Sequence, residues 1–302
     1  MSLAIVTTSH KPDFPSFARL HASVLEHTDP STQHIVAVPG LDVPLFESIG
    51  SDRLTVVSER STLPSRFVPA TRLARIPRIP RGFRIAAINT TRPWPPIRGW
   101  ILQQMVKLSV VSELEVDVAL IIDSDVLLVR SVDESAFQSD GVVRLYRLPD
   151  GITPDMTRHL AQRAKARRLL GVAAAESRSP DYIAGIVSWD PALVRDMLER
   201  IEATTGRRWQ DCVGQSLDFS EFITYGTYVM MLAEPGRRAF VGDRSLSHSH
   251  WGPTPLTRDA AQRFVEALAP DDLAIHVQSN TGTDESVLRF IADAVAAQSR
   301  ST

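Results

Sequence analysis

The sequence predicts an α/β fold in which a mixed, mostly parallel sheet is flanked by helices. Short runs of apolar and β-branched residues recur along the chain, which is typical of strands buried on both faces of a sheet. Stretches with helical periodicity separate these runs, and this spacing favours right-handed crossovers and parallel pairing. The 302 residues, 43 % of them hydrophobic, are enough for one large domain of this class.

Each expected element of the first half has a local reason. The runs at 3–8, 33–38 and 54–57 are short and apolar, and Pro39-Gly40 closes the second of them. Between the runs, apolar residues recur every three to four positions, which predicts amphipathic helices. The expected helices of this half cover 13–27, 43–49 and 100–113.

The segment 60–98 interrupts this alternation. It is rich in arginine and proline, and no acidic residue occurs between Ser61 and Ser112. Because proline removes a backbone donor, a long regular element is excluded here. Two interpretations stay open: a basic flap over phosphates or an anionic acceptor, or a solvated insertion without a binding role.

The second half continues the alternation of strands and helices. Proline at the first helical turn, as at Pro191, is a recognised start signal. The remaining expected elements are strands at 141–146, 181–189 and 239–241, and helices at 153–170, 191–203 and 218–232.

The most informative stretch is 118–130, VALIIDSDVLLVR. An apolar run ends at Asp123-Ser124-Asp125, and a second apolar run follows. Open α/β sheets bind ligands outside the carboxyl ends of their strands, where these two carboxylates are expected. Hard divalent cations need oxygen ligands and can bridge to substrate phosphates, so the pair predicts a metal site. The alternative is two Asp residues that only shape a turn after a strand.

Composition excludes several classes of protein. The formal net charge of −2 argues against a dedicated nucleic-acid binder, and no apolar stretch is long enough to span a membrane. The start of the chain lacks the basic residues of a signal peptide. Cys212 is the single cysteine, which excludes an intramolecular disulfide and fits a reducing cytosol. We therefore expect a cytoplasmic protein, with peripheral attachment to the inner face of the membrane left open.

Two stretches carry polar groups suited to a nucleotide. Thr7, Thr8 and Ser9 end the first strand, where hydroxyls can hold a ribose or base; turn formation is the alternative. Gln104 and Lys107 share the polar side of helix 100–113. A lysine ahead of the two carboxylates can meet a diphosphate as a point charge, although a solvated surface lysine is the other interpretation.

The sequence LDFSEFITYGTY is the second informative region. Asp218 or Ser220 can cap a helix here, which places Glu221 in the first turn, where negative charge is favourable. Glu221, Tyr225 and Tyr228 share one helical face, and an acid flanked by tyrosines suits a polyhydroxylated ring. Complementarity to the helix dipole alone would also explain the glutamate.

Histidines near the end of the chain can complete a metal coordination shell. His250 lies in SHSHW, and His276 lies in IHVQSN at the end of an expected strand. A nitrogen ligand added to two carboxylates is a suitable environment for Mn²⁺. We rank His276 ahead of His250 because it ends a strand, as Asp123 does; a structural role is the alternative for each.

Several stretches together resemble a known family of enzymes. They are the first strand with its TT pair, WILQQMVKL, IIDSDV, YIAGIVSW, SEFITYGTY and IHVQSN. The set is similar to GT-A type nucleotide-sugar glycosyltransferases and, more narrowly, resembles a bacterial family of DUF6492 type. The resemblance covers roughly residues 3–282, and the Arg/Pro segment is its least typical part.

The resemblance implies a GT-A fold, a Rossmann-like sheet of the nucleotide-diphospho-sugar transferase type, in one domain over 1–302. Residues 1–130 would form the nucleotide-binding half, with the insertion at 60–98, and residues 131–302 the acceptor-binding half with the C-terminal helices. It also implies Mn²⁺ or Mg²⁺, a UDP- or GDP-linked sugar donor, and transfer to a hydroxyl acceptor on a glycan, a lipid or a small molecule. Donor, acceptor and stereochemistry stay open.

The resemblance also assigns roles to single residues. Asp125 would bind the ion, Asp123 would share it through water or hold the ribose, and Lys107 would stabilise the departing diphosphate. Glu221 would be the general base of an inverting enzyme, with Asp218 in reserve, or would orient the acceptor in a retaining one. The expected nucleotide contacts are Thr7, Thr8, Ser9, Gln104, Lys107, Asp123 and Ser124. The expected sugar or acceptor contacts are Gly185, Trp189, Tyr225, Tyr228, Trp251, Ser279 and Asn280.

Two other functions stay open. DSDVLL after an apolar strand also resembles the nucleophile motif of haloacid-dehalogenase-like phosphatases, in which Asp123 would attack phosphorus. Against this, strand-like segments precede the motif, and no second acid follows Gly242-Asp243 closely. A non-catalytic sugar-nucleotide-binding protein is the other alternative.

Overall fold

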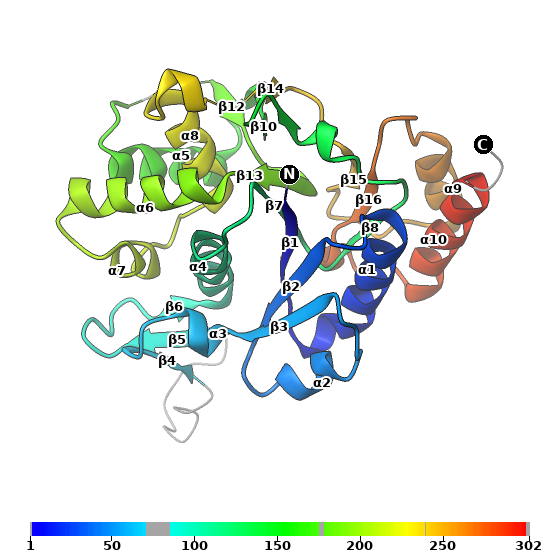
Figure 1. Ribbon diagram of the computed structural model, residues 1–302, viewed down its shortest axis with the longest axis horizontal. Helices are drawn as coiled ribbons and strands as arrows, with labels where there is room; N and C mark the ends of the chain where they lie inside the picture. Colours follow the sequence, from blue (N-terminus) through cyan, green and yellow to red (C-terminus); the bar gives the residue numbers. More distant parts are fainter. Residues whose placement is uncertain (1, 71–84, 175–177, 239, 300–302) are drawn as a thin grey trace.

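The computed structural model describes residues 2–70, 85–174, 178–238 and 240–299 (Figure 1). Its strands are β1 Leu3–Thr8, β2 Gln33–Val38, β3 Leu54–Ser58, β4 Phe67–Pro69, β5 Ile85–Asn89, β6 Ile97–Arg98, β7 Val118–Ile122, β8 Val126–Leu128, β9 Gln138–Ser139, β10 Val142–Tyr146, β11 Leu148–Ile152, β12 Ser179–Asp181, β13 Ile186–Trp189, β14 Phe240–Gly242, β15 Ser247–His250 and β16 Ala274–Val277. Its α-helices are α1 Phe14–His27, α2 Val43–Glu47, α3 Glu59–Thr62, α4 Gly99–Ser112, α5 Thr157–Leu170, α6 Pro191–Thr205, α7 Trp209–Gly214, α8 Glu221–Met231, α9 Arg258–Glu266 and α10 Glu285–Ser299.

The central sheet contains five strands in the order β13-β7-β1-β2-β3. β3, β2, β1 and β7 run parallel, and β13 pairs antiparallel with β7 at one edge. Every residue of β1 and β7 is buried, as expected for strands covered on both faces. The predicted α/β class with a mixed, mostly parallel sheet is confirmed, and the predicted strands at 3–8 and 33–38 coincide with β1 and β2.

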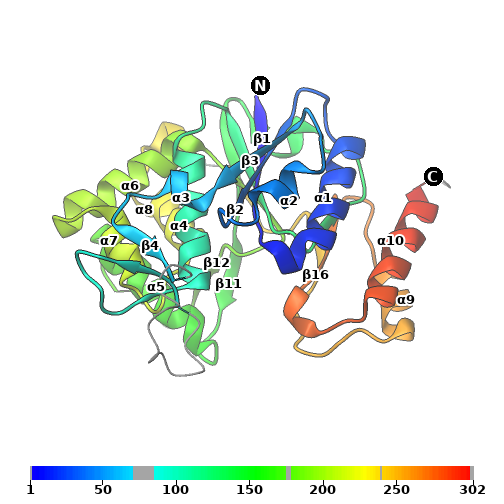
Figure 2. The same ribbon diagram turned by 90° about the horizontal axis from the view of Figure 1, so that it is seen from below.

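Helices cover both faces of this sheet. α4 lies against one face with α5 to α8 beyond it, and α1 lies against the other with α9 and α10 farther out (Figure 1). Figure 2 shows these two helical groups at opposite ends of the molecule. The largest apolar core joins the sheet to α4, α6 and α8, and a second core joins the sheet to α1. In the described ranges, none of the helices is both long enough and apolar enough to cross a lipid bilayer.

The motif Asp123-Ser124-Asp125 connects two sheets. β7 ends just before it in the central sheet, and β8 begins just after it in a separate sheet of order β15-β16-β8. β16 pairs antiparallel with β8, so that His276 lies opposite Val126. Residues from the end of the chain are thereby brought beside a motif that precedes them by about 150 positions.

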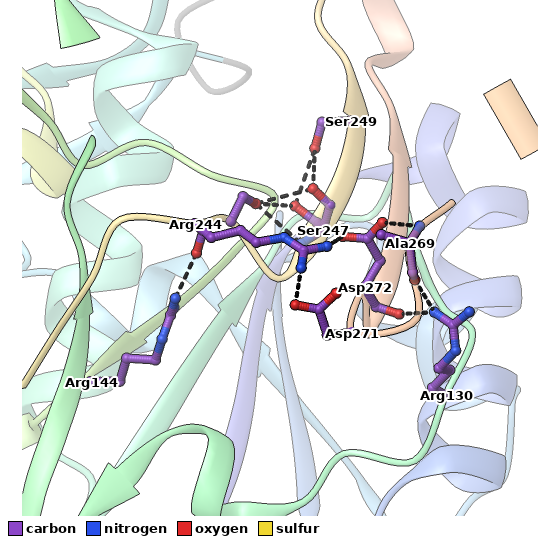
Figure 3. Close-up of polar contacts among 9 residues, drawn as sticks. Arg130, Arg144, Arg244, Ser247, Ser249, Ala269, Asp271 and Asp272 are labelled. Carbon is purple, nitrogen blue, oxygen red and sulfur yellow. Dashed lines mark hydrogen bonds and ion pairs between the residues drawn. The ribbon is translucent and has the colours of Figure 1, made fainter. Parts of the chain in front are cut away.

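A polar network fixes this second sheet (Figure 3). Arg244, which precedes β15, forms ion pairs with Asp271 and with Asp272, the latter at 3.0 Å between Nη2 and Oδ1. Arg144 Nη2, from β10, donates to the Arg244 carbonyl at 2.6 Å. Arg130, which follows β8, donates to the Asp272 carbonyl. The turn before β16 is therefore tied both to β10 and to the segment after β8.

The Arg/Pro segment is more ordered than the sequence predicts. A small antiparallel sheet, β4-β5-β6, lies within 60–98. Residues 71–84, with the arginines and prolines among them, lie outside the described ranges. The choice between a flap and a solvated insertion therefore stays a prediction.

Two expected elements of the second half are divided differently. The strand expected at 181–189 is split into β12 and β13, and α5 begins at Thr157 because the residues before it pair with β12 as β11. The polar run 247–250 is itself a strand, β15, rather than a loop after one. The strand expected from Ala239 is described only from Phe240, because residue 239 lies outside the described ranges.

Candidate active site

Lys107, Asp123 and Glu221 form an ion-pair cluster beyond the end of β7. Lys107 Nζ lies 2.7 Å from Asp123 Oδ1 and 3.4 Å from Glu221 Oε1. The side chains of Lys107 and Glu221 are 7 % and 4 % exposed, whereas that of Asp123 is 50 % exposed. The interpretation of Lys107 as a solvated surface lysine is wrong, and Asp123 is the member of the cluster that reaches the surface.

The start of α8 explains how Glu221 reaches this position. Ser220 caps the helix, since its Oγ accepts a hydrogen bond from Ile223 N–H at 3.3 Å. The Glu221 N–H donates to Gln104 Oε1 at 3.0 Å, which ties α8 to the polar side of α4. Of the two predicted caps, Ser220 therefore serves and Asp218 does not; Asp218 is exposed ahead of the helix.

Burial and charge act against each other in this cluster. Burial alone would lower the pKa of Lys107, but the Asp123 and Glu221 carboxylates raise it above its usual value. Burial raises the pKa of Glu221, and the Lys107 charge opposes that rise. The ammonium therefore stays charged, and its charge favours the ionised form of Glu221.

Asp125 has different partners, on and after β16. Its Oδ1 lies 3.4 Å from His276 Nε2, and its Oδ2 accepts a hydrogen bond from Ser279 N–H at 2.8 Å. Burial opposes the charge of Asp125, but His276 and the Ser279 N–H together lower its pKa below the usual value. The side chains of Asp125 and His276 are 15 % and 4 % exposed, so an ionised carboxylate is held beside a buried imidazole.

This second pair fits part of a divalent metal site. Within the described ranges, Asp125 Oδ1 is buried without a hydrogen-bond partner, which is uncommon, and the nitrogen that faces it at 3.4 Å is His276 Nε2. The other ring nitrogen, His276 Nδ1, is also unpartnered but does not face this carboxylate. A carboxylate oxygen and an imidazole nitrogen are ligands that suit Mn²⁺. Among the described residues, no group of three or more His, Cys, Asp or Glu side chains is placed to hold a metal ion. The pair thus offers an incomplete shell, of the kind that Mg²⁺ completes with water and substrate phosphates.

Residues around His276 differ in their access to ligand. The Trp251 and His276 rings meet edge to face with centroids 4.4 Å apart, and Trp251 is 47 % exposed. Gly185 instead packs against protein: a Cβ there would lie 2.7 Å from Ser247 Oγ and 3.1 Å from His276 Cβ. Trp251 can therefore contact a ligand beside the pair. Gly185 instead lets the backbone before β13 pack closely on Ser247 of β15 and His276 of β16.

His250, the lower-ranked predicted metal ligand, has a different environment. It is the last residue of β15, and its Nε2 lies 3.0 Å from the Thr254 carbonyl oxygen. Among the described residues, Asp125 forms an ion pair with His276, and no ion pair joins His250 to either carboxylate of the motif.

A large cavity lies at the carboxyl ends of β1 to β3, where open α/β sheets bind ligands. Its volume is about 1620 Å³, and its lining includes His10 after β1, Gly40 after β2 and Glu59 after β3. Gln103, from the first half of α4, also lines it. Gln103 precedes Lys107 by one helical turn, roughly 6 Å, so α4 connects the cavity wall to the ion-pair cluster, although Lys107, Asp123 and Glu221 do not line the cavity themselves.

Two predicted nucleotide contacts belong to the interior instead. Thr7 is 0 % exposed; its Oγ1 donates to the Ile122 carbonyl at 2.7 Å and lies 3.0 Å from His34 Nε2. Gln104 is 1 % exposed and binds the start of α8. Both polar groups are used within the protein, so these two side chains are structural. The other predicted hydroxyl contacts are also largely buried, at 8 % exposed for Thr8, 2 % for Ser9 and 8 % for Ser124.

Two aromatic residues expected at the sugar are core residues. Trp189 and Tyr225 are 0 % and 1 % exposed, with ring centroids 5.3 Å apart, and Tyr225 Oη accepts a hydrogen bond from Asp190 N–H at 2.9 Å. Tyr225 therefore packs on Trp189 of β13, whereas Glu221 on the same helical face meets α4, and the sequence pattern reveals neither neighbour. Tyr228 is 9 % exposed on the same helix.

Two further sugar contacts are placed only in part. Ser279 reaches the site through its backbone N–H, which Asp125 accepts. The burial of Asn280 and its side chain lie outside what the structure describes.

Three ionisable residues near the site were missed by the sequence analysis. His10 Nδ1 lies 2.9 Å from Asp13 Oδ2. Burial raises the pKa of Asp13, and the His10 charge opposes this rise. The Asp125 charge also raises the pKa of Asp13, so Asp13 lies near the second carboxylate of the motif. Burial and Asp42 raise the pKa of Glu59 to about 7 in the wall of the large cavity. Their position just after β1 and β3 is the signal that could have identified them.

Comparison with known protein families assigns this chain to a family but to no activity. A profile described as "Family of unknown function (DUF6492)" matches residues 1–251. No curated protein matches this chain.

Similar solved structures share little sequence with this chain. A galactosyltransferase, LgtC, in complex with donor and acceptor sugar analogues is 12 % identical, with 97 % of this chain and 95 % of that chain covered and a TM-score of 0.47. Mouse xyloside xylosyltransferase 1, in its apo form, is 10 % identical, with 93 % and 99 % covered and a TM-score of 0.48. The apo structure of the bifunctional glycosyltransferase WbbM is 11 % identical, with 99 % and 51 % covered and a TM-score of 0.40. Likeness at this level assigns no activity and no residue role.

Proposed function

Because the chain belongs to the DUF6492 family, whose function is unknown, we propose its activity from the site: a metal-dependent glycosyltransferase of the GT-A type. It moves a sugar from a nucleoside-diphosphate sugar, linked to UDP or GDP, to a hydroxyl acceptor on a glycan, a lipid or a small molecule. The site supports the metal and the diphosphate, whereas the sugar donor and the hydroxyl acceptor rest on the sequence resemblance.

One observation carries the proposal. Asp123 and Asp125 follow the buried strand β7 at the carboxyl edge of the sheet. Asp125 Oδ1 is buried without a hydrogen-bond partner and lies 3.4 Å from His276 Nε2. A cavity of about 1620 Å³ lies along the same edge, beside β1 to β3. Asp125 itself lines a smaller cavity of about 160 Å³. A carboxylate–imidazole pair at a sheet edge that also carries a cavity large enough for a nucleotide sugar supports metal-assisted transfer from a diphosphate donor.

The residues then take distinct roles. Asp125 and His276 hold Mn²⁺ or Mg²⁺, and Asp123 contributes from its half-exposed position. When bound, the ion neutralises charge on the departing diphosphate. Lys107 keeps Asp123 in place and adds positive potential at that point. Trp251 offers an exposed ring beside His276 for the sugar or the acceptor.

We assign Glu221 to positioning rather than to proton abstraction. Its carboxylate is 4 % exposed and paired with Lys107, so an acceptor hydroxyl cannot reach it without opening α8 from α4. Glu221→Gln is therefore expected to lower kcat, because it disturbs the positions of Lys107 and Asp123. The shape of the pH profile of transfer should stay the same, because Glu221 is not the base. Loss of the acidic limb of the pH profile in this variant would instead identify Glu221 as the base.

The proposal is tested first by binding. Manganese together with UDP or GDP should raise the melting temperature, because a ligand at 100 times its Kd stabilises the native state by about 2.7 kcal/mol. Asp125→Asn should abolish the metal-dependent part of this shift, and Asp52→Asn, an exposed carboxylate on the β2–β3 connection, serves as the matched control. Absence of any shift with UDP or GDP in the presence of Mn²⁺ or Mg²⁺ would contradict the proposal.

Activity separates the alternatives. Slow, Mn²⁺-dependent hydrolysis of one UDP- or GDP-sugar in a donor screen supports a transferase, since water can replace the acceptor. Binding without hydrolysis of any donor would indicate the non-catalytic sugar-nucleotide-binding protein. Hydrolysis of simple phosphomonoesters that Asp123→Asn abolishes would indicate the phosphatase.

A further inference from the structure

A second, smaller cavity lies on another face of α8, among α5, β12 and the end of β10. Its volume is about 240 Å³. One ordered water needs roughly 10–15 Å³ of such space, so the cavity has room for a tetrahedral anion with several waters. The polar residues that line it are Arg147, Arg163, Arg167, Ser179, Tyr182 and Thr227.

Two cationic side chains of this cavity, those of Arg147 and Arg167, face neutral partners among the described residues. Arg167 Nε donates to the Ala173 carbonyl at 2.5 Å, and its Nη1 lies 3.2 Å from Met231 Sδ. Arg147 and Tyr182 line the cavity together, and the Arg147 charge opposes the rise that burial causes in the pKa of the Tyr182 phenol. Within the described part of the chain, neither Arg147 nor Arg167 has a carboxylate partner. Their charge is therefore available to a ligand.

The surroundings add to the positive potential. α5, TRHLAQRAKARRLL, contains five arginine or lysine residues and no acid. Burial lowers the pKa of Arg163, and the charge of Arg167 adds to that effect, so these two guanidinium groups are close enough to repel each other. Among the described residues, Asp181 adjoins the cavity lining in sequence, and its carboxylate accepts from the N–H groups of Tyr182 and Ile183 at 2.8 and 3.2 Å. A bound anion would relieve the repulsion.

Tyr182 is held in the wall of the cavity by a glycine in α8. A Cβ at Gly226 would lie 2.3 Å from the Tyr182 ring, so the ring packs directly on the helix backbone. Tyr182 is 6 % exposed, and burial raises the pKa of its phenol to about 12. The phenol therefore keeps its proton at neutral pH and can donate it to a ligand in the cavity.

We propose that this cavity is a binding site for a small oxyanion, the phosphate or sulfate group of a ligand, held by Arg147 and Arg167 with the Tyr182 hydroxyl as a further donor. Arginine is suited to this chemistry because its planar fork matches the oxygens of phosphate. The site uses Ile223 and Thr227 of α8 as a wall, whereas Glu221 begins the same helix at the ion-pair cluster. It stands whether or not the chain transfers sugars.

The test measures phosphate binding in metal-free buffer at constant ionic strength. Calorimetric titrations measure the binding of inorganic phosphate, sulfate and glycerol phosphate. They compare the wild-type chain with Arg147→Gln and Arg167→Gln. Each substitution should weaken binding by about tenfold or more, since each removes charged hydrogen bonds. Arg168→Gln, which removes an exposed arginine next to Arg167 on α5, is the matched control and should leave the affinity unchanged.

A third variant keeps the test decisive if an arginine variant folds poorly. Tyr182→Phe removes only the hydroxyl and should weaken binding severalfold while the unfolding midpoint changes little. Tighter binding of glycerol phosphate than of inorganic phosphate identifies the phosphate group of a larger ligand as the occupant; the reverse order identifies free phosphate. Equal affinity in wild type, Arg147→Gln and Arg167→Gln, or no binding beyond that of chloride, overturns the proposal. Because the nucleotide site shares none of these residues, this outcome is separate from failure of the proposed transferase.

Discussion

Removal of Lys107 tests the ion-pair cluster most directly. In Lys107→Met, the Glu221 carboxylate keeps its burial but loses the ammonium 3.4 Å away. Breaking a buried ion pair by removing one partner costs about 3–5 kcal/mol. Asp123 adds little to this cost, because its side chain is 50 % exposed and water replaces the ammonium. We therefore expect a loss near the lower end, about 3 kcal/mol, from a total that is typically 5–15 kcal/mol.

The loss should depend on pH, with a sign that follows from Glu221. Burial already raises the pKa of Glu221, and without Lys107 only the hydrogen bond from the Glu221 backbone N–H opposes that rise, while the Asp123 charge adds to it. The folded variant then binds a proton at pH values where the unfolded chain, with a glutamate pKa near 4.5, does not. Stability of the variant relative to wild type is therefore best at low pH and falls as pH rises through the raised pKa. The difference should be smaller at pH 5 than at pH 8.

Urea unfolding followed by tryptophan fluorescence measures this difference, with the midpoint and the slope compared at both pH values. Lys11→Met, an exposed lysine outside any ion pair in the described ranges, is the control. The double variant Lys107→Met/Glu221→Leu should recover most of the loss, because an apolar pair can replace a buried ion pair. A loss below about 1 kcal/mol in Lys107→Met, or one that does not change with pH, would refute the argument.

Three further predictions follow from other contacts. Gly185→Ala should weaken Mn²⁺ binding, measured by calorimetry, because the added Cβ would lie 2.7 Å from Ser247 Oγ and 3.1 Å from His276 Cβ; unchanged affinity would contradict this packing argument. Burial, with the neighbouring His21 charge, lowers the pKa of His34 to about 3. Between pH 6.5 and 5 only the unfolded histidine gains a proton, so the chain should lose up to about 2 kcal/mol of stability over this range. His34→Gln should remove that part of the pH dependence in urea unfolding. Glu59→Gln should raise the urea midpoint at pH 8 but not at pH 4.5, because the pKa of Glu59 is raised to about 7 and its ionisation destabilises the fold above that value; equal midpoints at pH 8 would refute it.

The fold class could be predicted because its signal is local. The apolar runs of β1, β2 and β7 need no tertiary information, and their predicted bounds agree with the structure to within a residue or two. β15 could not be predicted, since SHSH lacks an apolar pattern and becomes a strand through its parallel pairing with β16. The split of 181–189 likewise follows from pairing of β12 with β11.

The site was predictable only where a residue's chemistry is unusual for its position. Two carboxylates after a buried strand pointed to Asp123 and Asp125 without knowledge of their partners. The polar side of α4 was expected to face ligand or solvent, but the start of α8 covers it and makes Gln104 and Lys107 interior groups. Tyr225 lies on a helix, as predicted, but its side chain packs on Trp189 of β13, a neighbour that the sequence does not indicate.

The contacts of Asp125 give the site a stability of its own. His276 and the Ser279 N–H both come from β16 and the turn after it, beyond residue 251, where the family profile ends. That strand is four residues long and is anchored by β8, β15 and the network around Arg244. A subglobal opening of this short unit would strip Asp125 of its partners while the central sheet and Lys107 stayed folded. The apparent affinity for an ion is then scaled by the fraction of molecules in which this one strand is closed, not by the global stability of the chain.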